Sequence, residues 1–63
     1  MRTLSYYIEA VAELNLALNI LIERIPCFAE WYPLEEDESY LVVKIDCREE
    51  DAAFAEYMLA PFV

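Results

Sequence analysis

The sequence predicts an α+β fold in the order helix, strand, strand, helix, within one compact acidic domain spanning residues 1–63. An apolar stretch without proline or glycine opens the chain, a central segment can pair with itself as a hairpin, and a second apolar stretch follows a run of acids. The chain is 60% hydrophobic and contains five Tyr, three Phe and one Trp, whereas disordered acidic tails contain few such residues. We therefore expect it to fold.

Residues 4–25 are predicted to form a long N-terminal helix, with Thr3 or Ser5 as the N-cap. Apolar residues recur at three- and four-residue steps, which places them on one inner face of a helix. These residues are Tyr7, Val11, Leu14, Leu18, Leu21, Ile22 and Ile25. Pro26 ends the helix, because proline disfavours helical angles in the residue before it.

Leu16 and Ile20 widen the apolar arc of this helix toward the side of Glu9, Glu13 and Glu23. A helix that is apolar around more than half of its circumference is usually covered on two sides. The sequence therefore indicates self-association, or pairing with another chain, through this helix.

The segment 27–47 is predicted to be an antiparallel hairpin in which paired residue numbers sum to 74. One face then holds only apolar pairs: Cys27 with Cys47, Ala29 with Ile45, Trp31 with Val43, and Pro33 with Leu41. The other face is mixed: Phe28 with Asp46, Glu30 with Lys44, Tyr32 with Val42, and Leu34 with Tyr40. This register leaves a five-residue loop, Glu35 to Ser39.

Pro33 has no amide hydrogen, so the apolar pairs must be the non-hydrogen-bonded ones, with alpha carbons about 4.5 Å apart. Cys27 and Cys47 then face each other closely enough for a disulfide. We expect free thiols instead, because the cytosol is reducing. A zinc site would need two further ligands from carboxylates or another chain.

A short C-terminal helix is predicted after the hairpin. Asp46 followed by Glu49 resembles a capping box, and acids at 49–51 favour the positive end of a starting helix. Its inner stripe is expected to contain Ala53, Phe54, Tyr57, Met58 and Phe62. Glu56 faces outward and Pro61 ends the helix.

The chain is expected to act in the cytoplasm. Charged and amide side chains interrupt the longest apolar stretch, which a membrane-spanning helix would rarely tolerate. The sequence also lacks the pattern of a signal peptide.

Catalysis is not expected. Without histidine, no residue shuttles protons near neutral pH, and without glycine there is no phosphate-binding loop. A carboxylate site around Glu30 or Asp46 would need a cleft, which so small a domain would struggle to form. The acids at 35–38 lack the ligand spacing of a calcium loop, so we expect no cofactor and no dedicated metal site.

Charge is the main functional signal. Thirteen acidic residues against four basic ones give a net charge of −9 at pH 7, which repels nucleic acid and anionic membranes and attracts basic protein surfaces. Acids also promote solubility, which is the simpler explanation. The candidate partner-binding residues are Glu9, Glu13, Glu35, Glu36, Asp37, Glu38, Glu49, Glu50 and Asp51. Tyr32 and Tyr40 could anchor such a contact, whereas a core role is favoured for Trp31.

In size, acidity and aromatic content, with charge gathered at 35–38 and 49–51, the chain resembles the phage-encoded anti-CRISPR proteins and related DNA mimics. The resemblance implies a non-catalytic inhibitor in the host cytoplasm that binds a basic, nucleic-acid-binding protein surface, for example that of a CRISPR surveillance complex. The alternative is a small structural or regulatory subunit that forms a homodimer, or pairs with a partner, through the apolar helix face around Leu16 and Ile20.

Overall fold

The computed structural model describes residues 1–63 and contains three strands and two helices. They are β1 (Arg2–Glu9), α1 (Ala12–Arg24), β2 (Cys27–Leu34), β3 (Asp37–Cys47) and α2 (Ala52–Leu59), with 3₁₀ turns at Glu49–Asp51 and Ala60–Phe62. The strands form one antiparallel sheet in the order β1-β3-β2. Neither helix has the length and apolar run that crossing a bilayer requires.

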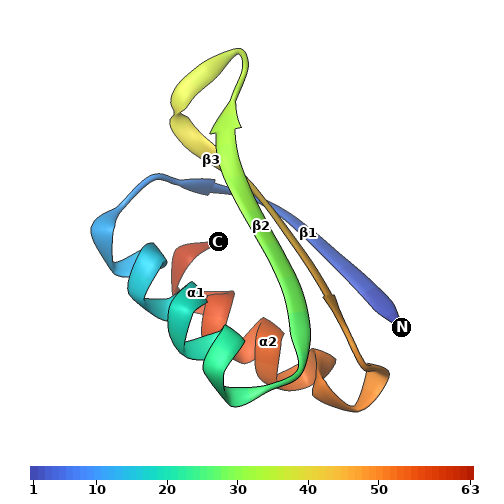
Figure 1. Ribbon diagram of the computed structural model, residues 1–63. Coiled ribbons are helices and arrows are strands. Elements are labelled where there is room, and N and C mark those ends of the chain that lie inside the picture. Colours follow the sequence, from blue (N-terminus) through green and yellow to red (C-terminus); the bar gives the residue numbers. More distant parts are fainter.

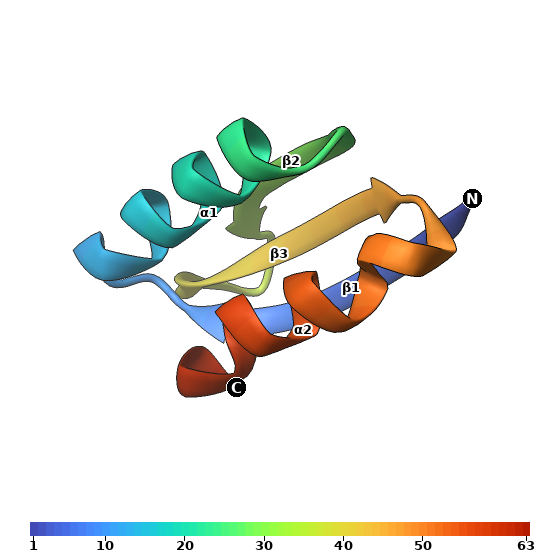
Figure 2. The same cartoon turned by 90° about the horizontal axis from the view of Figure 1, so that it is seen from below.

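The sheet has one covered and one open face (Figures 1 and 2). Both helices pack on the inner face, α1 toward β2 and α2 toward β1, and between them and the sheet lies the apolar core. The core residues are Leu4, Ile8, Leu14, Leu18, Leu21, Val43, Ile45, Cys47, Ala52, Ala55 and Leu59. No element covers the outer face.

The predicted order of elements is wrong at the N-terminus, because the long helix over 4–25 does not form. A strand occupies Arg2–Glu9 and the helix begins only at Ala12, so Thr3 and Ser5 are strand residues and not N-caps. Buried Leu4 and Ile8 alternate with exposed residues. Successive strand side chains point to opposite faces, so this alternation suits a strand with one buried side.

The rest of the first helix agrees with the sequence pattern. Leu14, Leu18 and Leu21 are buried, as predicted for the inner face. The helix ends at Arg24, and the residue before Pro26 has extended angles, as predicted. Two predicted inner residues are instead exposed: Ile22, on the flank of the helix, and Tyr7, which lies in β1.

The predicted hairpin register is confirmed over seven consecutive pairs, from Cys27 with Cys47 to Pro33 with Leu41. The eighth pair is wrong, since Leu34 pairs with Asp37 and not with Tyr40. The register shifts there, so the turn contains only Glu35 and Glu36 and not the five residues predicted. Glu30 and Lys44 pair in register but form no ion pair.

The C-terminal helix forms, but its inner face is rotated from the predicted one. Ala52, Ala55 and Leu59 are buried, whereas Ala53 and Tyr57 are exposed. Phe54, Met58 and Phe62 do pack against the core as predicted. Small alanines at the contact allow the helix to approach its neighbours closely, which favours this rotation over one that buries Tyr57.

The predicted capping box of Asp46 and Glu49 does not form. A 3₁₀ turn at Glu49–Asp51 precedes the helix, and neither it nor α2 has a side-chain cap. Asp46 instead accepts a hydrogen bond from the Thr3 hydroxyl (2.5 Å), its direct cross-strand partner on the outer face. β1, which the sequence did not predict, therefore supplies the hydrogen-bond donor for the Asp46 carboxylate.

Three side chains on the inner face of the sheet have a raised pKa. Burial raises the pKa of the Cys27 and Cys47 thiols above their ordinary value of 9.0, and each has nearby negative groups that add to the effect. Burial likewise raises the pKa of Tyr6, with Glu56 adding to the shift. Both cysteines are free thiols and face each other across β2 and β3.

Hydrogen exchange of the β1 amides tests the strand that the sequence pattern did not predict. The Ala10 amide donates to the Ser39 carbonyl, and alternation along the ladder then directs the amides of Leu4, Tyr6 and Ile8 toward β3. We expect these three to exchange at least about tenfold more slowly than those of Thr3, Ser5 and Tyr7. Uniform protection over these residues, measured by NMR, would indicate a helix and contradict the fold.

Alkaline pH should destabilise the protein. A group whose pKa is higher in the folded state than in the unfolded state stabilises the fold fully at pH values below its unfolded pKa. This contribution to the free energy of unfolding is lost as the pH rises through its folded pKa. We expect the free energy of unfolding to fall above pH 9, the ordinary thiol value. Urea titrations at pH 7 and above 9 check this. The fall should be smaller in the Cys27→Ala, Cys47→Ala double variant, and an identical fall would contradict the assignment.

Candidate functional site

The hairpin tip gathers four consecutive carboxylates. Glu35 and Glu36 form the turn, and Asp37 and Glu38 begin β3; all four are exposed. Asp37 Oδ1 accepts hydrogen bonds from the Ser39 hydroxyl (2.6 Å) and the Ser39 amide (3.0 Å). These bonds lower the pKa of the Asp37 carboxyl, which favours its charged form. The tip is therefore shaped by its own polar contacts.

Two more candidate acids lie toward the same end of the sheet. Glu9 is the last residue of β1 and pairs with Tyr40, and Glu13 lies in the first turn of α1. Neither these two nor the four tip carboxylates take part in an ion pair. We call the six residues Glu9, Glu13, Glu35, Glu36, Asp37 and Glu38 the acidic end.

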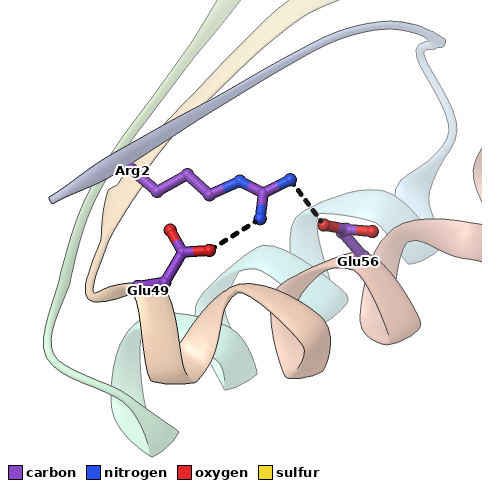
Figure 3. A network of polar contacts seen from close by, with 3 residues as sticks. All are labelled: Arg2, Glu49 and Glu56. Carbon is purple, nitrogen blue, oxygen red and sulfur yellow. Dashed lines mark hydrogen bonds and ion pairs between the residues drawn. The ribbon is translucent and has the colours of Figure 1, made fainter.

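The remaining candidates, Glu49, Glu50 and Asp51, have basic partners. Arg48 Nε lies 2.7 Å from Asp51 Oδ2 and 3.5 Å from Glu50 Oε1. The hydrogen bond to Asp51 raises the pKa of Arg48. Arg2 reaches from the start of β1 to Glu49 (3.1 Å) and Glu56 (3.5 Å), as Figure 3 shows. Two arginines thus offset part of the charge of four acids.

The two acidic clusters lie at opposite ends of the molecule. Asp37 begins the 11-residue strand β3, and Glu49 follows its end, so the length of the sheet separates them (Figure 1). The longest extent of the chain is 32 Å. The structure therefore does not bring the predicted site residues together on one surface: it leaves the acidic end unpaired and joins the other cluster to arginines.

The outer face of the sheet contains the aromatic residues that adjoin the acidic end. Tyr32 and Tyr40 are exposed there, on the strands that form the tip. Tyr7 is also exposed on this face, opposite Val42. Trp31 points to the inner side, packs against the core and donates its indole N–H to the Asn15 side chain of α1 (3.1 Å). The core role favoured for Trp31 is therefore confirmed.

Tyr7 is the surface residue that the sequence reasoning missed. The signal was present as the two-residue alternation of Leu4, Tyr6 and Ile8 with Thr3, Ser5 and Tyr7. Tyr7 also fits the helical period of the apolar residues that follow it, so the sequence pattern placed it on the inner face of a helix. No proline or glycine marks the boundary between residues 2–9 and residues 12–24.

The surface has little concavity. One hollow of about 160 Å³ opens on the β1 and β3 side of the sheet, lined by Ser5, Tyr6, Tyr7, Val42 and Lys44. No group of three His, Cys, Asp or Glu side chains is arranged to hold a metal ion. A surface of carboxylates and tyrosines with so small a hollow is suited to contact with a macromolecule.

No family model matches the chain, and no significant match is found among curated proteins or solved structures.

Proposed function

We propose that this chain is a non-catalytic acidic protein that binds a basic, nucleic-acid-binding surface of another protein and thereby competes with nucleic acid. The observation that supports the proposal best is the acidic end, where six carboxylates have no basic partner. Their charge remains available to a cationic groove, whereas the charge of Glu49, Glu50 and Asp51 is partly offset within the molecule.

The concentration of these charges supports mimicry of a phosphate backbone. Nucleic acid presents closely spaced negative charges along its axis. Four consecutive acids, two in the turn and two at the start of β3, likewise concentrate negative charge at the exposed hairpin tip. A basic groove that holds phosphates can accept them without reading any base. We place this action in the cytoplasm, against proteins such as a CRISPR surveillance complex.

A matched pair of triple variants tests the proposal. Glu35→Gln, Glu36→Gln, Glu38→Gln removes three charges from the acidic end and spares Asp37, which shapes the tip. Glu23→Gln, Glu49→Gln, Glu50→Gln removes the same charge elsewhere. The assay is displacement of labelled duplex DNA from a panel of basic DNA-binding proteins. We expect the tip triple to weaken displacement about tenfold or more, and the control triple much less.

The same assay at rising salt should weaken displacement by the unmodified chain, because salt screens exposed charges. Equal losses in the two triples would show that only net charge matters and would contradict the role of the tip. Failure of the unmodified chain to displace DNA from any protein of the panel would contradict the function itself. Circular dichroism establishes that each variant is folded.

A second candidate function is supported by the outer side of α1. Leu16 is 66% exposed, and Ile20, one turn later, is 40% exposed. Apolar side chains so placed on a helix favour contact with another helix, so the chain could act as a structural subunit that forms a homodimer. We call Leu16 and Ile20 the apolar ridge of α1, and the acids Glu13 and Glu23 border it.

Sedimentation of two helix variants separates this candidate from the first. Leu16→Glu places a charge on the ridge, whereas Asn19→Glu makes the same change in charge at an exposed neighbouring position. If the ridge is an interface, Leu16→Glu should convert a dimer to a monomer, Asn19→Glu should leave the dimer intact, and high salt should hardly matter. A monomer at high micromolar concentration for the unmodified chain would exclude the dimer.

A further inference from the structure

Three tyrosines form a continuous surface on the open face of the sheet. Tyr7 of β1 and Tyr32 of β2 both pair with Val42 of β3, one from each side, and Tyr40 lies two residues along β3 on the same face. Val42 is only 8% exposed although no helix covers this face. Its neighbours on this face therefore cover it, and its two cross-strand partners there are tyrosines; we call Tyr7, Tyr32 and Tyr40 the tyrosine face.

The rings themselves stay open to solvent. Tyr7 is 71% exposed, and Tyr32 and Tyr40 are 42% and 40% exposed. Tyrosine is enriched in the centres of protein interfaces, because its ring offers a large contact area at a low cost in conformational entropy. Three such rings around a buried valine thus provide a preformed surface for a partner.

Carboxylates border the tyrosine face on its tip side. Glu9 pairs directly with Tyr40, and the acids at 35–38 extend beyond it. Directly paired residues have beta carbons about 4.5 to 5.5 Å apart, so a group stacked on Tyr40 lies within reach of Glu9. Lys44, the only base on the outer face, pairs with Ser5 and Glu30 on the side away from the tip. The side away from the tip therefore has one base beside Glu30 and Asp46, whereas the tip side has acids alone, which favours a cationic partner near the tip.

Arginine is the side chain that fits rings and carboxylates together. Its guanidinium is planar, stacks on aromatic faces and donates in a fork that matches a carboxylate. Lysine offers a strongly hydrated point charge and stacks less well. A second copy of this chain would bring a net charge of −9 against another −9, which disfavours it as the occupant.

We propose that the tyrosine face binds an arginine-rich segment of the partner protein, with guanidinium groups stacked on Tyr32 and Tyr40 and paired with Glu9 and the tip carboxylates. The inference rests on the proposed function and specifies the partner chemistry: the basic surface is recognised by arginine and not by charge alone.

Titration of the full chain with oligoarginine and oligolysine peptides of equal length tests this. The unmodified chain should bind oligoarginine about five- to tenfold more tightly than oligolysine. Tyr32→Leu, Tyr40→Leu should abolish the preference and leave weaker binding of both peptides. Tyr57→Leu, which removes an exposed tyrosine of α2, should keep it. Tyr32→Phe, Tyr40→Phe should also keep it, because the rings remain.

Chemical-shift mapping on the unmodified chain makes the test independent of how the leucine variant folds. Oligoarginine should shift the ring signals of Tyr7, Tyr32 and Tyr40 and leave those of Tyr57 in place. Shifts confined to the acidic end, or equal affinity for the two peptides, would overturn the inference. Movement of the same tyrosine signals with protein concentration alone, without peptide, would also overturn it, in favour of a second copy.

The two proposals fail differently. If the leucine variant keeps the arginine preference while the tip triple still loses DNA displacement, the tyrosine face is not the site and the proposed function stands. If the arginine preference depends on the tyrosines but no DNA displacement occurs with any protein of the panel, the proposed competition with nucleic acid fails, and the face binds arginine in another context.

Discussion

The pairing of β3 on both of its edges is the constraint on which this structure depends. Val43, Ile45 and Cys47 of β3 are fully buried, because the strand lies between β1 and β2 and beneath both helices. A two-stranded hairpin is marginal in water, and a third strand with helices on one face gives so short a chain a core. The same arrangement leaves the opposite face without cover, so one constraint produces both the core and the candidate binding surface.

The sequence predicts the hairpin well because only one register satisfies both faces. Seven pairs follow from the requirement that Cys27, Ala29 and Trp31 meet apolar partners. At the tip the register shifts between Pro33 and Leu34, and Asp37 accepts hydrogen bonds from Ser39 there, a local polar contact that a register rule does not include. The α+β class, the end of the first helix before Pro26 and the existence of a C-terminal helix also follow from the pattern, whereas the start of the first helix does not.

The first strand could not be recognised by the same argument. Residues 2–25 contain no proline or glycine, and their apolar positions fit both a two-residue and a helical period over a short window. Whether residues 2–9 form a strand or a helix depends on their pairing with β3. A local sequence pattern contains no information about pairing with residues so far along the chain. The misplaced Tyr7 follows from this error. The separation of the acids at 35–38 from those at 49–51 does not, because the predicted hairpin already places them at its tip and beyond its base.

Acidic and basic side chains are distributed unevenly along the long axis of this molecule. The arginines at 2 and 48 lie at the end where the chain starts and where β3 finishes, and they offset the acids there. The other end receives no base from any element. A small acidic domain can thus be polarised along its long axis without a buried charge, since all of its buried residues are apolar.

The arm formed by the last residues of β2 and the first of β3 extends beyond the end of β1, and its tip is fully exposed. Folding free energy comes mainly from buried apolar area, so residues 35–39 contribute little to it. Natural variation can therefore lengthen, shorten or recharge this arm while the body of the protein stays folded.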